Sequence, residues 1–203
     1  DGRPFGYHSA DHRKWLNSGL QPSMMSMIFP AGEMEGMSDD SQKQARPVFS
    51  TGCRASGVLL PIASLPSPYG IGDLGATAQA WIDRIHDAGQ SFWQFLPLGP
   101  TGFGGSPYSS ASSFAGNWLL ISPAALREDG LLRARDIEKS AFSETTVDYE
   151  EVTRFKGRLL DTVWARFSSA AGKKLRPAFE QFCHDHAHWL DDYALFEALK
   201  TKL

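Results

Sequence analysis

Cysteine is scarce in this chain of 203 residues, which contains only Cys53 and Cys183. Two cysteines cannot build a disulfide framework or a four-cysteine zinc site. We expect both to be reduced thiols in a cytosol-like compartment, so the predicted location is cytoplasmic. Long apolar runs are also missing, because none approaches the roughly 18 residues of a membrane span, and the first residues show no signal-peptide pattern. We therefore predict no membrane association.

An excess of charge of one sign is lacking as well. Lys and Arg total 20 against 23 Asp and Glu, a formal net charge of −3. Proteins that bind nucleic acid or an anionic membrane usually carry a basic surplus, so neither partner is expected. Hydrophobic residues make up 42% of the chain, which is enough for a sizeable core.

What is present is an alternation of strand and helix patterns. The apolar runs at 57–62 and 91–99 predict two buried strands. Between them, residues 76–89 have the apolar period of a helix. The predicted helical face consists of Ala78, Trp81, Ile82, Ile85 and Ala88. Strand, helix and strand with short links predict a β/α unit with parallel strands, and hence an α/β fold class. A short third strand is predicted over 115–123.

After Pro123 the apolar spacing becomes helical. Residues 148–167 predict one helix, and residues 177–200 predict another with Pro177 in its first turn. The apolar positions of the first are Val152, Phe155, Leu159, Val163 and Phe167. Those of the second are Phe179, Phe182, His186, Leu190 and Tyr193.

The segment GIGDLG, Gly70 to Gly75, matches the glycine spacing of a dinucleotide-binding loop. In such a loop the first glycine follows the strand directly, whereas Ala63 to Tyr69 intervene here. The second predicted strand also has no acidic residue to hold a ribose. A plain loop is therefore favoured, and a nucleotide-dependent enzyme is the weaker alternative.

Other candidate chemistry is incomplete. His184 and His188 lie one helical turn apart, but a tetrahedral metal site needs three or four ligands, so no metal and no cofactor are predicted. The serines between Ser106 and Ser113 lack the G-x-S-x-G context of a nucleophile. Asp73 is the only carboxylate near the glycine-rich loops, so the pair needed for glycoside chemistry is not in place.

The loop after the second predicted strand is the most unusual segment. Gly99 to Pro107 contains four glycines, which let a backbone approach a ligand closely, and two prolines, which stiffen it. Phe103 and Tyr108 add flat faces, and Ser106 and Ser109 add hydroxyls. This combination suits a sugar ring. A rigid structural loop with ordinary buried aromatics is the alternative, and composition leaves both open.

Longer segments carry a resemblance to a known family. "SGVLLPIASLPSPYGIGDLG", "AGQSFWQFLPLGPTGFGGSPYSS" and "SSFAGN" resemble the N-terminal part of 4-α-glucanotransferases of the amylomaltase type. "VDYEEV" and "WLDDYALFEALK" fit the same family further along, so the resemblance covers about residues 55–200. It implies the N-terminal part of a (β/α)8 barrel with helical insertions, incomplete in this chain. It also implies transfer of α-1,4-glucan segments between maltodextrins by a retaining mechanism. A non-catalytic carbohydrate-binding module is the alternative from another class.

The resemblance further implies site residues. Tyr108 corresponds to the family's tyrosine that stacks on the sugar beside the cleaved bond, and Ser106 and Gly104 lie on the loop that lines the groove. Phe103 stands where relatives often have tyrosine, so we expect stacking there without a hydroxyl contact. The family's catalytic carboxylates come from later strands, so no catalytic residue is expected in this chain.

Three segments are expected along the chain. Residues 1–52 are predicted to be a disordered or non-native leader, residues 53–123 the first βα units with the groove loops, and residues 124–203 a truncated helical insertion. The chain starts at Asp1, not Met, and stops inside a helical pattern. We therefore expect a fragment.

Overall fold

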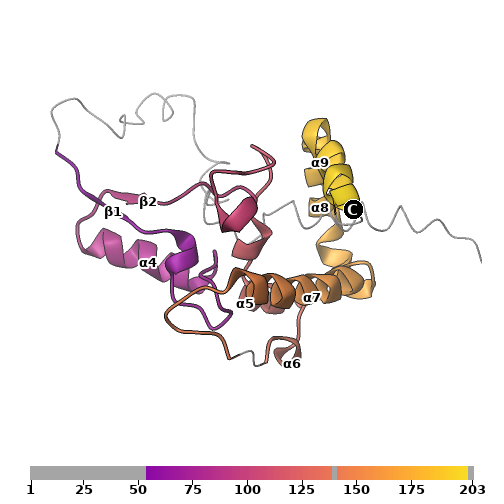
Figure 1. The fold of residues 1–203 in the computed structure, drawn as a ribbon. Coiled ribbons are helices and arrows are strands. Elements are labelled where there is room, and N and C mark those ends of the chain that lie inside the picture. Colours follow the sequence, from indigo (N-terminus) through magenta and orange to yellow (C-terminus); the bar gives the residue numbers. More distant parts are fainter. Residues whose placement is uncertain (1–53, 139–140, 201–203) are drawn as a thin grey trace, which may run out of the picture.

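The computed structural model describes residues 54–138 and 141–200 (Figure 1). The predicted leader over 1–52 lies outside the described residues. The elements, with 3-10 helices marked η, are in chain order β1 (Gly57–Leu59), η1 (Ile62–Ser64), α4 (Ala76–Asp87), β2 (Phe92–Gln94), η2 (Phe103–Gly105), η3 (Trp118–Leu120), α5 (Pro123–Glu128), α6 (Ala134–Ile137), α7 (Tyr149–Phe167), η4 (Ala170–Lys174), α8 (Arg176–Asp185) and α9 (Ala187–Lys200). None of the described helices combines the length and the apolarity needed to cross a bilayer.

The two strands are parallel neighbours and α4 connects them, as predicted. Gly57 pairs with Phe92 and Leu59 with Gln94. A Cβ atom at Gly57 would lie 2.6 Å from the Phe92 carbonyl oxygen, so this position needs glycine. The strands are less buried than predicted, and Leu59 is 58% exposed. The reason is that each strand has a single neighbour in the described sheet.

Helix α4 buries a narrower face than its sequence predicts. Ala78 and Ile85 are buried and Trp81 is half-buried, but Ile82 and Ala88 are exposed. A sheet of two strands covers only a narrow stripe of the helix that crosses it, and Ile82 and Ala88 lie outside that stripe in the described part of the chain.

The predicted third strand over 115–123 is wrong, because this segment forms η3. The Asn117 side chain accepts a hydrogen bond from the Leu119 N–H at 3.0 Å, and backbone bonds from Leu120 to Asn117 and from Ile121 to Trp118 close local turns. These local bonds take the place of a strand ladder. A capping side chain can decide whether a short apolar segment forms a helical turn or a strand when periodicity alone does not.

Helix α7 is confirmed, and it organises the main core. All five of its predicted apolar positions are buried. Four of them pack with Ile121, Leu126 and Leu131, which come from the end of η3, from α5 and from the turn after it. Val152 packs instead with Ile71 and Leu119. In Figure 1, α7 runs beside α5, with β1, β2 and α4 near one of its ends and α8 and α9 rising from the other.

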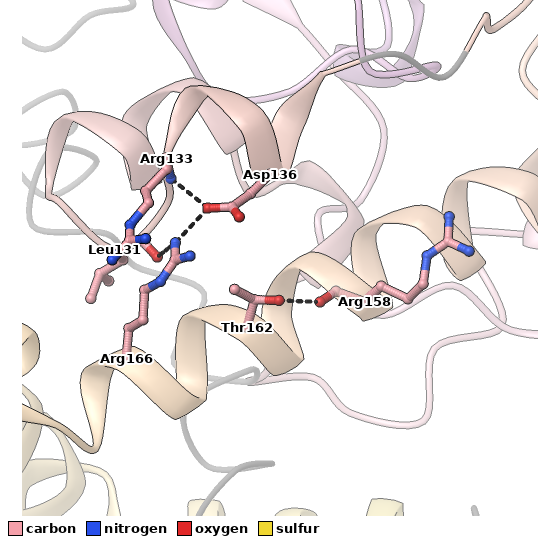
Figure 2. A network of polar contacts seen from close by, with 6 residues as sticks. All are labelled: Leu131, Arg133, Asp136, Arg158, Thr162 and Arg166. Atoms are coloured by element: carbon pink, nitrogen blue, oxygen red, sulfur yellow. Dashed lines mark hydrogen bonds and ion pairs between the residues drawn. The ribbon is translucent and has the colours of Figure 1, made fainter.

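A polar network ties α6 to α7 on the surface of this core (Figure 2). The Arg166 guanidinium donates to the Asp136 carboxylate at 2.6 Å and to the Leu131 carbonyl at 3.0 Å. The same carboxylate oxygen accepts from the Arg133 N–H at 2.7 Å. The hydrogen bond from Arg166 lowers the pKa of Asp136.

The second predicted helix is divided. It breaks at His186, where the backbone leaves helical geometry (φ −109°, ψ 11°). The His186 ring packs on Phe182 with ring centroids 4.3 Å apart and accepts from the Trp189 indole N–H at 3.3 Å. These side-chain contacts hold the chain in the bend between α8 and α9.

Candidate functional site

The glycine-rich loop follows β2 and closes on itself. The Gly102 N–H donates to the Ser106 carbonyl at 2.9 Å, and the Gly105 N–H donates to the Gly102 carbonyl at 3.1 Å. Gly104 adopts a left-handed conformation with φ +67°, which favours glycine. A Cβ atom at Gly102 would lie 2.2 Å from the Ser109 carbonyl oxygen. The glycines thus permit a tight turn and a close return of the chain.

The aromatic rings of this loop point outward. Phe103 is 99% exposed and Tyr108 is 74% exposed. These two rings are therefore not the buried aromatics that the alternative of a structural loop expected. The Ser106 hydroxyl accepts from the Tyr108 N–H at 3.3 Å, which restrains the backbone that carries the Tyr108 ring. Phe103, Gly104, Ser106 and Tyr108 all lie on this one exposed turn.

Tyr149, which the sequence analysis did not single out, lies next to Gly105 of the loop. A Cβ atom at Gly105 would lie 3.4 Å from the Tyr149 ring. Tyr149 is the first residue of α7, whose N-cap is Asp148, with its carboxylate accepting from the Glu151 N–H at 2.9 Å. The start of the long helix therefore sits against the turn that carries Phe103 and Tyr108.

Asp73 lies in the interior, not at a groove. It accepts a hydrogen bond from the Gly75 N–H at 3.0 Å, next to the start of α4. Burial raises the pKa of its carboxyl, and the Lys156 ammonium and hydrogen bonds from Gly75, Ser122 and Ser67 partly offset that rise. This carboxylate has a structural environment, so it is no candidate for acid–base work on a sugar.

Lys156 is the buried residue that sequence reasoning missed. It is 2% exposed, and its ammonium donates to the backbone carbonyl of Ile121 at 2.9 Å and to that of Leu119. Burial lowers its pKa from 10.5 to about 8. A signal was available, since Lys156 lies four residues after Val152 and so on the apolar face of the predicted helix.

The glycines of GIGDLG face protein atoms and leave no room for a phosphate. A Cβ atom at Gly70 would meet the Phe142 ring at 2.4 Å, one at Gly72 the Ile62 carbonyl at 2.0 Å, and one at Gly75 the Ser122 hydroxyl at 2.5 Å. These glycines allow close internal packing. The observation counts against the nucleotide-binding alternative.

The histidine segment gives no metal centre. Among residues 54–138 and 141–200, no group of three His, Cys, Asp or Glu side chains is placed to hold an ion. His184 is exposed, His186 belongs to the bend, and the His188 ring lies against Phe114 at 5.9 Å between centroids.

A hollow of about 410 Å³ lies along one face of α4, and no residue of the glycine-rich loop lines it. It is lined by Leu65, Pro66, Ala76, Thr77, Ala80, Trp81 and Arg84. Its wall is mostly apolar, and the buried Trp81 indole N–H has no hydrogen-bond partner. None of the predicted glucan-binding residues lines it.

Comparisons with known proteins agree with the resemblance. The sequence model of the 4-alpha-glucanotransferase family matches residues 60–203. The chain is 44% identical over 151 residues to the 4-alpha-glucanotransferase of Aquifex aeolicus, covering 73% of this chain and 30% of that protein. The Thermus thermophilus relative is 45% identical over 147 residues, covering 72% and 29%.

Structure comparison points the same way. The fold is similar to that of the amylomaltase from Streptococcus agalactiae in complex with acarbose, with a TM-score of 0.66 and 35% identity, over 74% of this chain and 30% of that chain. The chain spans about 30% of the length of the relatives it matches. From the family match, the identities and the shared fold, we conclude that this chain belongs to the 4-alpha-glucanotransferase family.

Proposed function

We propose that the protein transfers α-1,4-glucan segments from one maltodextrin to another by a retaining double displacement, as a 4-alpha-glucanotransferase. The observation that carries this proposal is the exposure of Phe103 and Tyr108 on the glycine-rich turn of the loop that follows the parallel strand β2. In (β/α)8 barrels ligands lie at the C-terminal ends of the strands. The acarbose in the Streptococcus agalactiae relative supports a glucan as the ligand.

In this proposal residues 53–123 are the first βα units of the barrel and carry part of the glucan groove, and residues 124–203 are a helical insertion. Tyr108 stacks on a sugar ring next to the reacting bond. Phe103 provides a second apolar face, and Ser106 and Gly104 shape the turn between them. No cofactor or metal takes part. The cytoplasmic location remains a prediction from the cysteine content.

The catalytic carboxylates belong to other parts of such an enzyme. A retaining mechanism needs a nucleophile and an acid/base group about 5–5.5 Å apart. Asp73, the carboxylate near the glycine-rich loops, is buried beside Lys156. We therefore propose that this chain by itself does not act on maltotriose.

A chimera tests the function directly. Residues 60–200 of this chain replace the aligned segment of the Aquifex aeolicus relative, and release of glucose and longer dextrins from maltotriose is measured. We expect turnover by the folded chimera and none by the 203-residue chain. A folded chimera that binds maltotriose but does not turn it over would reject the proposal, and activity of the chain alone would show that it has a catalytic pair.

The alternative of a stand-alone carbohydrate-binding module has little support. Such modules are usually small and all-β. The described residues contain two strands of three residues each, and most of the rest of their regular structure is helical. A glucan-binding role without chemistry would be indicated if the 203-residue chain bound maltodextrin and the chimera stayed inactive.

A further inference from the structure

Phe114 is exposed although its backbone is firmly held. Its side chain is 65% exposed. The Ser112 hydroxyl accepts from the Phe114 N–H at 3.1 Å and from the Ala115 N–H at 3.0 Å, and Ala115 itself is buried. The Phe114 ring is therefore exposed on a backbone that hydrogen bonds restrain.

The Phe114 ring joins two rings of α9. It stacks on Trp189 with centroids 5.7 Å apart and planes at 17°, and it meets His188 edge-on at 5.9 Å and 84°. Trp189 is held in turn, because its indole N–H donates to the His186 imidazole. We call Phe114, His188 and Trp189 the aromatic platform. The loop at Phe114 and helix α9 together form the platform, and hydrogen bonds restrain both segments.

The loop that carries Phe114 is uncharged and rich in hydroxyls. No Asp, Glu, Lys, Arg or His occurs between Asp87 and Arg127, a stretch that contains Phe114. Ser110 and Ser113 are exposed beside it in the chain, and His188 is exposed on α9. Anionic ligands and charged peptides would find few charged partners on this loop. A flat ring edged by neutral hydrogen-bonding groups suits a ligand with an apolar C–H face and a rim of hydroxyls, which is a sugar.

We propose that the aromatic platform binds a glucose unit of an α-1,4-glucan by stacking on Phe114, at a position separate from Tyr108. Trp189 supports the Phe114 ring from behind, and His188 offers a polar edge to the sugar hydroxyls. The choice of an α-1,4-glucan rests on the proposed function. The platform extends the contact surface of a long glucan beyond the glycine-rich turn.

Binding of maltoheptaose to the 203-residue chain tests this inference by isothermal titration calorimetry. Phe114→Ala should raise the dissociation constant roughly fivefold or more, while Phe114→Tyr should keep it near the parent value. Phe196→Ala is the matched control, because Phe196 is a partly exposed aromatic of α9 (47% exposed) outside the platform. We expect it to leave the dissociation constant unchanged. Cellohexaose, a β-linked chain, should bind more weakly than maltoheptaose.

Several results would overturn the inference. They are equal affinities for parent and Phe114→Ala, equal losses in Phe114→Ala and Phe196→Ala, or no binding of maltoheptaose by the parent. Thermal melting shows whether Phe114→Ala stays folded, and if it does not, Phe114→Ser and Trp189→Ala are titrated in its place. The chimera assay tests the proposed function separately. Turnover by a chimera with or without Phe114 would support that function. An unchanged dissociation constant in Phe114→Ala would reject the aromatic platform alone.

Discussion

Asp73 and Lys156 are buried together, and neither charge reaches solvent. Asp73 is 6% exposed and Lys156 is 2% exposed. For both groups burial outweighs their mutual attraction, which raises the pKa of Asp73 and lowers that of Lys156. The pair links the loop before α4, the carbonyls around η3 and the middle of α7. It therefore holds together the segments on either side of the glycine-rich turn.

The pH dependence of stability should report Lys156. In the unfolded chain a lysine keeps its proton up to about 10.5, whereas folded Lys156 loses it at about 8. The unfolded state then binds more protons in this window, so the free energy of unfolding rises with pH. The free energy of unfolding of the parent minus that of Lys156→Met should increase by up to about 2 kcal/mol between pH 8 and pH 9.5. Urea unfolding at each pH measures it, and a flat difference would contradict the lowered pKa.

Titration of Tyr69 does not interfere with this measurement. Burial and the Asp73 charge raise the pKa of the Tyr69 phenol. A raised phenol pKa makes the free energy of unfolding fall as pH rises above the normal tyrosine range of about 10. Readings below pH 9.5 therefore isolate the lysine.

Replacement of Tyr108 should affect turnover without affecting folding. Because Tyr108 is 74% exposed, Tyr108→Ala should change the free energy of unfolding by no more than about 0.5 kcal/mol. In the active chimera it should lower maltotriose turnover roughly tenfold through lost stacking. Tyr108→Phe keeps the ring and should cost less. A stable Tyr108→Ala chimera with full activity would remove Tyr108 from the site.

Two glycines of the turn should resist substitution for different reasons. Gly104 has φ +67° and open space around it, so Gly104→Ala should cost about 1 kcal/mol from the backbone alone and Gly104→Asn less. Gly102 has φ −88°, but an added Cβ would collide with the Ser109 backbone. Gly102→Ala should therefore cost more than Gly104→Ala. Thermal unfolding of the three variants checks this order, and the reverse order would contradict the turn geometry.

The network in Figure 2 should contribute stability that acid removes. Because the Arg166 hydrogen bond lowers the pKa of Asp136, its contribution is present at neutral pH and is lost as pH falls below about 4. Asp136→Asn should lower the free energy of unfolding by about 1 kcal/mol at pH 7. Glu150→Gln is the control, because the Arg154–Glu150 pair is 3.9 Å apart and exposed. Equal effects of the two variants at pH 7 would argue against a special role for Asp136.

The sheet predicts self-association of the 203-residue chain. Among the described residues the sheet consists of β1 and β2 alone, and a short sheet of this kind can pair with a strand of another copy of the chain. Leu59 and Phe95 add exposed apolar surface there, at 58% and 43%. Sedimentation velocity should show association that increases with concentration and weakens in Leu59→Lys. A monomer over the whole concentration range would contradict this prediction.

Local patterns in the sequence determined several features of this protein by themselves. The apolar period of 148–167 specified α7, and the strand, helix and strand pattern specified the parallel unit of β1, α4 and β2. Glycine and proline marked the turn that carries Phe103 and Tyr108. These features depend on residues close together in the chain, so their periodicity and turn chemistry can be read directly.

Only the tertiary structure decided the rest. It placed the buried Lys156 ammonium on the Leu119 and Ile121 carbonyls, which lie at and beside η3. It also stacked Phe114 on Trp189 and left Tyr108 in solvent. Each of these outcomes depends on groups brought together from distant segments. The free energy of burying a lysine or exposing a ring is set by those neighbours and not by the adjacent residues, and for this reason sequence pattern alone could not predict it.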